Sequence, residues 1–142
     1  MTISADSSFF VSLYLVDRHS KDAWNRVASN PDVWLTPLNR AEVFHAIYAH
    51  VFWQKVTLLQ AEKAIANFRR SCENGVWNIS EFPAGAFDRS TDLARQFGPT
   101  IGIRTIDSLH VGCALELKSR KFWTFDDRQA KLALAVGLDI AP

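Results

Sequence analysis

The fold of this chain is decided by the stretch GIRTIDSLHVGCALEL, residues 102–117. Ile106, Leu109 and Cys113 follow the three- and four-residue spacing of a helix face that packs into a core. Thr105 stands just before them, where a hydroxyl can accept a hydrogen bond from an amide of the first helical turn. The spacing therefore predicts a buried helix over 105–117 with Thr105 as its cap.

Asp107 lies in the first turn of this predicted helix, and two interpretations of it stay open. A carboxylate there complements the helix dipole, which is worth roughly 0.3–1 kcal/mol. On the helical wheel, however, Asp107 lies beside His110, Val111 and Ala114, on a largely apolar stripe. An unpaired carboxylate on such a stripe is costly to desolvate, so Asp107 needs a cation or a hydrogen-bond donor nearby.

Composition and charge describe an ordinary globular chain. Of the 142 residues 48% are hydrophobic and 22% are charged, and the formal net charge is +1. These values predict one domain over 1–142 and no disorder, and they give no strong field that would attract nucleic acid or a membrane. The two cysteines form no zinc motif, and no segment looks like a signal peptide or a membrane span, so we expect a cytoplasmic protein.

Short strands and helices alternate in the pattern of apolar residues. We expect strands over 2–5, 33–36, 76–79 and 121–124, an edge strand over 138–140, and helices over 9–16, 21–29, 37–51, 57–72, 83–97, 105–117 and 128–136. Such alternation is typical of an α/β domain with a parallel sheet that is covered on both faces. In these sheets ligands bind beyond the carboxyl ends of the strands.

Acidic residues fall at those strand ends. Asp6 follows the first predicted strand, and Asp126 and Asp127 follow a late one. Each of them is also suited to capping the next helix, so none is diagnostic alone. Glu42 differs, because it lies on a helix face of small apolar residues, where an unpaired charge is rare.

Taken together, these acids predict a cation site. Two carboxylates about 4 Å apart repel each other by about 4 kcal/mol at an effective dielectric constant near 20. Converging acids therefore need protons or a bound cation, and hard oxygen ligands favour Mg²⁺, with Mn²⁺ as the alternative. A divalent ion of this kind suits the hydrolysis of a phosphodiester.

Four segments resemble those of the PIN-domain nucleases, and within them the VapC-type toxins of type II toxin–antitoxin systems. The resemblance covers essentially the whole chain, and its most specific part is the Asp107 segment. The segments are Asp6-Ser7-Ser8, Asn39-Arg40-Ala41-Glu42-Val43, Arg104-Thr105-Ile106-Asp107-Ser108-Leu109-His110 and Thr124-Phe125-Asp126-Asp127-Arg128.

The resemblance implies a three-layer α/β/α sandwich with a short-stranded, mainly parallel sheet, and Mg²⁺-dependent endoribonuclease activity. It implies that the acids of the site are Asp6, Glu42, Asp107 and Asp126, with Asp6 and Asp107 as the metal ligands. Asp127 competes with Asp126 for the fourth place. It also implies an RNA substrate, inhibition by a cognate VapB-like antitoxin, and a homodimer.

Five further residues belong to the predicted site, Asp127 among them. Ser7 and Thr124 match hydroxyl positions beside the first and fourth acids and, like Asp127, are expected to position the acids or the phosphate. Arg104 and Arg128 flank the acidic segments and are candidates for contact with RNA.

Three other classes of protein bring acids to strand ends. A receiver-like signalling domain requires a lysine after a late strand, and Thr124-Phe125-Asp126 stands there instead. A haloacid-dehalogenase phosphatase requires a second aspartate two residues after the first, where this chain has Ser8. A catalytically silent PIN fold that only binds a partner is disfavoured by the intact acids.

Overall fold

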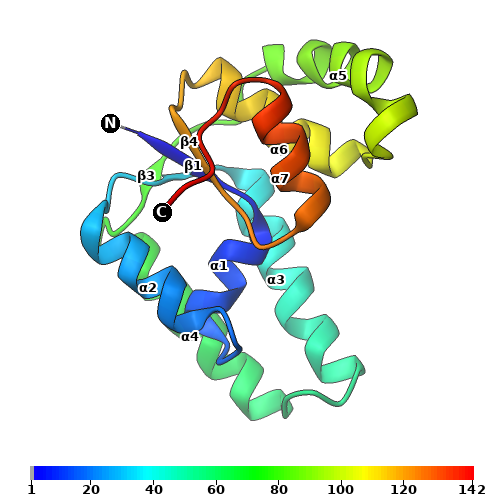
Figure 1. Ribbon diagram of the computed structural model, residues 1–142. Helices are drawn as coiled ribbons and strands as arrows, with labels where there is room; N and C mark the ends of the chain where they lie inside the picture. The colour runs from blue at the N-terminus through cyan, green and yellow to red at the C-terminus, as the bar shows by residue number, and fades with distance from the viewer. Residues whose placement is uncertain (1) are drawn as a thin grey trace. The chain divides into compact units, whose positions relative to one another are not determined.

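In a computed structural model, which describes residues 2–142, helices and short strands alternate along the chain (Figure 1). The strands are β1 (Ile3–Ala5), β2 (Trp34–Leu35), β3 (Asn78–Ile79) and β4 (Lys121–Trp123). The helices are α1 (Ser7–Tyr14), α2 (Ser20–Ser29), α3 (Pro37–Phe52), α4 (Leu58–Glu73), α5 (Gly85–Ile101), α6 (Thr105–Glu116) and α7 (Asp127–Ala135). Within residues 2–142, no helix has the length and apolar character needed to cross a membrane.

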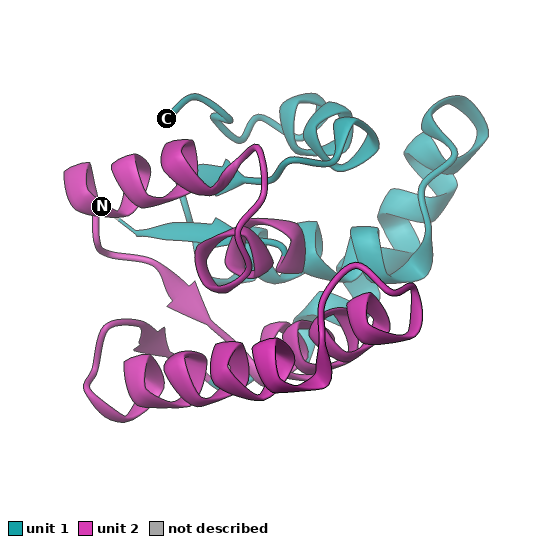
Figure 2. Cartoon of the chain, turned by 90° about the horizontal axis from the view of Figure 1, so that it is seen from below, with its two compact units in different colours: residues 1–6, 81–142 teal, residues 7–80 magenta. Residues whose placement is uncertain are grey.

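The chain divides into two compact units, which Figure 2 distinguishes by colour. The first unit joins residues 1–6 to residues 81–142, and the second comprises residues 7–80. Each unit has its own pair of parallel strands, β1 with β4 in the first and β2 with β3 in the second.

In the first unit, β1 and β4 pair in parallel so that Ala5 lies opposite Trp123. The strands and helices of this unit enclose a hydrophobic core of fully or nearly fully buried side chains, among them Leu93, Val111, Ala114, Phe122, Leu132, Ala133 and Leu138. Helix α6 is buried from Asp107 to Ala114, which includes its charged and polar residues. The residue after each paired strand, Asp6 or Thr124, therefore lies at the same carboxyl edge.

Gly112 lets α6 approach α5 closely. A Cβ atom at this position would lie 2.9 Å from the backbone oxygen of Ala86 and 3.1 Å from Cβ of Arg89. Real Cβ atoms do not come that near to a backbone oxygen, so only glycine fits without a shift of α5. The close contact fixes α6, and with it Asp107.

In the second unit, the helices pack around aromatic side chains. Phe10 is fully buried and meets Trp77 edge-to-face at 5.2 Å between ring centroids. Helices α3 and α4 each begin with a reciprocal capping box, Thr36 with Asn39 and Thr57 with Gln60. These caps satisfy backbone groups that the first turn leaves unpaired, so both starts are well defined.

The predicted order of strands and helices is confirmed, but several details were wrong. Thr105 does not cap α6; it is the first helical residue, and the Asp107 carboxylate accepts the hydrogen bond from the backbone amide of Arg104. Ile106 is 37% exposed instead of facing the core. The predicted strand over 138–140 is only an isolated bridge between Lys121 and Asp139.

Two helix boundaries also differ. Helix α1 begins at Ser7 and ends at Tyr14, about one half-turn earlier than expected. Helix α5 continues through Pro99 to Ile101, although Gly98-Pro99 was predicted to stop it. It ends at Gly102, whose left-handed φ of 68° allows its amide to bond the Gly98 carbonyl. The left-handed glycine, and not the proline, terminates this helix.

Candidate active site

Asp6 is held at the carboxyl edge of the β1–β4 pair. Its backbone amide donates to the Trp123 carbonyl at 3.2 Å, which continues the parallel ladder by one residue. The Thr124 hydroxyl donates to Oδ2 of Asp6 at 2.6 Å, and Asp6 is only 7% exposed. The register of the two strands thus brings a buried carboxylate and its hydroxyl donor together from positions 118 residues apart in the chain.

Thr124 accepts a hydrogen bond as well as donating one. The backbone amide of Asp126 donates to Thr124 Oγ1 at 3.0 Å. Because an ionised carboxylate can only accept, the hydroxyl proton points to Asp6. Asp126 in turn caps α7, since its Oδ1 accepts from the amide of Gln129 at 3.0 Å.

Gln129 connects this series to the third acid. Its side-chain Nε2 donates to the backbone carbonyl of Asp107 at 3.2 Å. Gln129 has 0% exposure, and its Oε1 has no hydrogen-bond partner within residues 2–142. Hydrogen bonds therefore run from Asp6 through Thr124, Asp126 and Gln129 to Asp107, all within one unit.

The carboxylate of Asp107 is 6% exposed as a residue and is held by Arg104. Its Oδ2 accepts from both the backbone amide and Nε of Arg104 at 3.1 Å, and Oδ1 accepts from Nη2 at 3.3 Å. This bidentate pair supplies the cation that the sequence predicted Asp107 to need.

The other predicted residues make contacts of their own. In the second unit, the Ser7 hydroxyl donates to Oε1 of Glu42 at 3.1 Å. Asp127 and Arg128 are exposed in the first turn of α7. Of the two candidates for the fourth acid, Asp126 is the one that joins the hydrogen-bonded series. Hydrogen bonds through Thr124 and Gln129 thus link the predicted acids of the first unit.

Gln129 was missed by the sequence reasoning. The signal that could have found it is its place three residues after Asp126, where the side chain of a cap reaches the amide of the third helical residue. Nothing in the sequence shows that a glutamine at this place is fully buried.

The donor set fits a hard divalent cation. Within residues 2–142, no three His, Cys, Asp or Glu side chains gather closely enough to hold a metal ion by themselves. Mg²⁺ does not require such a cage, because it binds through one or two carboxylates and keeps waters or phosphate oxygens as its other ligands. Asp6 and Asp107 are buried oxygen donors of this kind.

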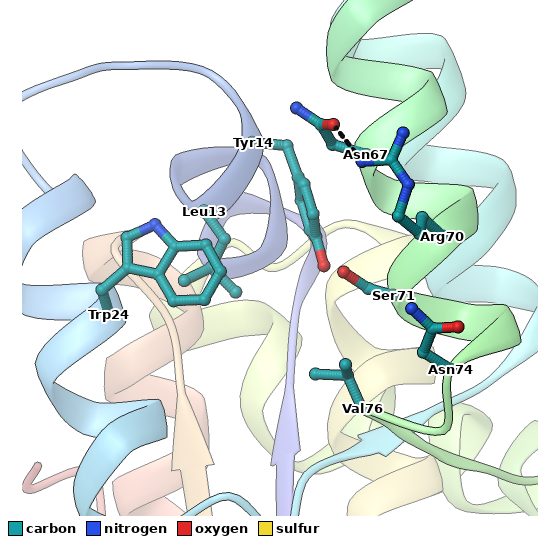
Figure 3. Close-up of a pocket in the computed structure, with 8 residues that line it drawn as sticks. All are labelled: Leu13, Tyr14, Trp24, Asn67, Arg70, Ser71, Asn74 and Val76. Carbon is teal, nitrogen blue, oxygen red and sulfur yellow. Dashed lines mark hydrogen bonds between the residues drawn. The ribbon is translucent and has the colours of Figure 1, made fainter.

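A separate pocket in residues 7–80 has a different character (Figure 3). It measures about 300 Å³ and is lined by aromatic and amide side chains, including Tyr14, Trp24 and Asn74. The Tyr14 hydroxyl accepts a hydrogen bond from Nε1 of Trp77 at 3.0 Å, and burial raises the pKa of Tyr14. Among the described residues, those that line this pocket include no Asp or Glu.

The fold is that of an α/β protein with a buried acid beyond the carboxyl end of a parallel strand, which is where such proteins bind ligands. The family model of the PIN domain matches residues 3–134, so this chain belongs to the PIN-domain family. A search of curated proteins finds no match. Membership in the PIN family excludes the receiver-like and phosphatase alternatives.

Solved structures of the same fold include a toxin and a protein bound to DNA. VapC20 of Mycobacterium tuberculosis, a toxin that cleaves the sarcin–ricin loop, matches with a TM-score of 0.72 and 17% identity over 99% of both chains. FitAcB of Neisseria gonorrhoeae matches with a TM-score of 0.66 and 16% identity over 99% of this chain and 96% of that chain. VapBC2 of Rickettsia felis, bound to a DNA fragment from its promoter, matches with a TM-score of 0.65 and 16% identity over 99% of this chain and 98% of that chain. These likenesses confirm the PIN fold, an α/β/α sandwich with short parallel strands.

Proposed function

We propose that this protein is a Mg²⁺-dependent endoribonuclease and the toxin of a toxin–antitoxin pair. The observation that carries the proposal is the hydrogen-bonded series that joins Asp6, Asp126 and Asp107 within a PIN fold. The full-length likeness to VapC20, which cleaves RNA in the sarcin–ricin loop, supports RNA as the substrate.

Asp6 and Asp107 would hold the ion. A divalent cation bound there supplies positive charge to the phosphodiester and lowers the pKa of the attacking water. Thr124 keeps Asp6 in place by donating to Oδ2, and Asp126 keeps Thr124 oriented. Gln129 holds the backbone of Asp107 in place by donating from Nε2 to its carbonyl.

In the proposed reaction, water attacks the phosphorus in line and the bond to the 3′ oxygen breaks. A carboxylate of the site accepts the proton of the water, and the leaving 3′ oxygen takes up a proton. Glu42, held by Ser7, and Asp126 are the acids that assist. The products are a 5′-phosphate and a 3′-hydroxyl.

Inhibition by a VapB-like antitoxin and formation of a homodimer belong to the same proposal, as does the cytoplasmic location. The likeness to VapBC2 supports an antitoxin partner. Exposed apolar side chains around the turn between α3 and α4 support a protein partner, because Phe52 is 83% and Leu59 is 80% exposed.

The test is cleavage of a mixed cellular RNA pool by purified protein with Mg²⁺ or with excess EDTA. We expect discrete fragments with Mg²⁺ alone, and Asp107→Asn should lower the rate on the order of 10²- to 10³-fold. Asp92→Asn is the matched control, because it removes the same charge from an exposed acid of α5 in the same unit and should leave cleavage within about twofold of the parent.

Equal cleavage by Asp107→Asn and the parent would contradict the proposal, as would full activity in EDTA. Fragments that end in cyclic phosphate would refute the role of water as the nucleophile. If the folded parent does not cleave any RNA of the pool while it still binds an antitoxin, the silent PIN fold is the correct alternative.

A further inference from the structure

Two arginines of the second unit share one aromatic ring. Cζ of Arg40, on α3, lies 5.7 Å from the ring centroid of Phe44, and Cζ of Arg69, on α4, lies 5.2 Å from it. The Phe44 ring itself meets Phe68, a fully buried residue of α4, edge-to-face at 6.1 Å. The Phe44 ring thus connects both guanidinium groups to the buried Phe68 of α4. We call Arg40, Phe44 and Arg69 the arginine cluster.

The two guanidinium groups of the arginine cluster have no carboxylate partner within residues 2–142. Within residues 2–142, neither guanidinium forms an ion pair or a hydrogen bond, although Arg26, Arg89 and Arg104 all pair with acids. Glu73 is the one acid among the residues that line the adjacent hollow, and it does not pair with either arginine. Two guanidinium groups are therefore pre-positioned and available to an anion.

The surface beside the arginine cluster has room for more than a single ion. A hollow of about 290 Å³ is lined by Arg40, Arg69, Cys72 and Glu73. Arg40 also lines a second hollow of about 260 Å³, whose other walls are the apolar groups of Pro37, Ala41 and Phe44. A charged hollow and an apolar hollow that share one arginine match the two chemistries of a nucleotide, a phosphate and a planar base.

The arginine cluster is distinct from the Ser7–Glu42 pair on the same helix. Arg40 and Phe44 are four residues apart and share one face of α3, whereas Glu42 lies between them in sequence and does not share that face. The arginine cluster and the carboxylate that Ser7 holds therefore lie on different faces of α3.

We propose that the arginine cluster, which contains none of the predicted acids, is an RNA-binding surface in which Arg40 and Arg69 bind backbone phosphates and the apolar hollow beside Phe44 holds a base. The proposal rests on the proposed function, since it takes RNA as the substrate. Arginine suits this role because its planar guanidinium binds phosphate in a bidentate manner and keeps its charge at every physiological pH.

The experiment measures the binding of a fluorescein-labelled, unstructured RNA of about 12 nucleotides by anisotropy at several KCl concentrations. EDTA is present throughout, so that RNA is bound and not cleaved. The test variant is Arg40→Gln with Arg69→Gln. The matched control is Arg18→Gln with Arg70→Gln, which removes two exposed charges from the same unit while leaving the arginine cluster intact.

If two phosphates bind here, the slope of log K against log salt falls in magnitude by about 1.4, because each contact with a single strand contributes about 0.7. Affinity for RNA should fall roughly tenfold and to the same extent for different sequences. The control should keep both the slope and the affinity of the parent. Circular dichroism checks that each variant is folded.

Equal losses in the test and control variants would overturn the proposal, because net charge alone would then explain binding. So would unchanged RNA binding accompanied by a weaker protein dimer in light scattering, which would assign the surface to a second copy. Competition by poly-glutamate as effective as that by unlabelled RNA would assign it to an acidic peptide. A loss of RNA binding specific to the test variant supports the surface even if the cleavage assay shows no nuclease.

Discussion

The acidic site and the arginine cluster differ in the burial of their charged groups and in the contacts that stabilise them. Asp6 and Asp107 are buried, and each has a donor from its own unit, Thr124 or Arg104. Arg40 and Arg69 are exposed, and an aromatic ring holds them in place of a carboxylate.

This difference follows from the cost of burial. A buried carboxylate without a partner is strongly destabilising, so the fold has to supply donors before any ligand arrives. An exposed guanidinium remains hydrated and costs little when unpaired, so it can stay available for a partner that comes and goes. The first arrangement suits chemistry on a fixed bond, and the second suits reversible contact with a flexible polyanion.

The largest effect is expected when a negative charge is added to the buried region. Gln129→Glu would replace the Nε2 donor to the Asp107 carbonyl with a carboxylate oxygen, in a position with 0% exposure. We expect a loss of about 3–5 kcal/mol in the free energy of unfolding at neutral pH, the cost of an uncompensated buried charge. Urea denaturation in the presence of EDTA measures this change in the free energy of unfolding.

The same substitution in the second unit is the control. Gln60 is exposed, and its Oε1 accepts from the amide of Thr57 in a capping box. Gln60→Glu keeps that acceptor and adds a negative charge at a helix N-terminus, so stability should change by less than about 1 kcal/mol. Similar losses from both substitutions would refute the contrast between the two regions.

Much of this fold could be predicted from the sequence, because hydrophobic spacing and strand–helix alternation depend on local residues. The order of strands and helices and the burial of Leu109 and Cys113 are of this kind. What could not be predicted was set by longer-range contacts. Asp107 displaces Thr105 from the capping role, because its carboxylate bonds the Arg104 amide and the Arg104 guanidinium at once.

The same limit applies to the site. The acids could be proposed from strand ends and a family resemblance, but the roles of Thr124 and Gln129 depend on strand register and complete burial. No local pattern shows that β1 and β4 pair with Ala5 opposite Trp123, and this register is what puts Thr124 beside Asp6. The arginine cluster needed the packing of α3 on α4, which the sequence does not specify.

A smaller effect is expected when the hydroxyl that holds Asp6 is removed. Thr124→Val keeps the shape of the side chain but removes the donor to Asp6 and the acceptor for the Asp126 amide. We expect a loss of about 1–3 kcal/mol in stability. In the proposed metal site, affinity for Mg²⁺ should fall about 10- to 100-fold by calorimetry, as for other groups that orient a metal ligand.

Thr124→Ser restores the hydroxyl and should recover most of the lost stability and most of the lost affinity for Mg²⁺. In the second unit, Ser7→Ala removes a single hydrogen bond to Glu42 and should cost only about 0.5–1.5 kcal/mol. If Thr124→Val binds Mg²⁺ as the parent does, Asp6 is not positioned by this hydroxyl for the metal.

The smallest effects concern the two thiols, one in each unit. Burial raises the pKa of Cys113 to about 12, with a further contribution from Glu116. Burial also raises the pKa of Cys72, but the charge of Arg40 partly offsets this. We therefore expect a disulfide reagent at pH 8 to label Cys72 first and Cys113 only on unfolding, because the thiolate is the reactive form.

The pH dependence of stability gives an independent check on Cys113. A thiol in the unfolded chain ionises near pH 8.5, whereas the folded thiol stays neutral to about pH 12. The unfolded state thus loses its proton first, so this contribution to stability is complete below about pH 8 and declines as the pH rises toward 12. Cys113→Ala should flatten the decline.

The reactivity of Cys72 reports on the arginine cluster directly. Because Arg40 lowers the pKa of Cys72, Arg40→Gln should raise that pKa and slow the labelling of Cys72 at pH 8, whereas Arg70→Gln should not. RNA bound to the cluster should slow labelling as well, by neutralising the guanidinium and covering the hollow that Cys72 lines. A labelling rate unchanged by both Arg40→Gln and RNA would show that the guanidinium does not act on this hollow, which would separate Cys72 from the surface proposed to bind phosphate.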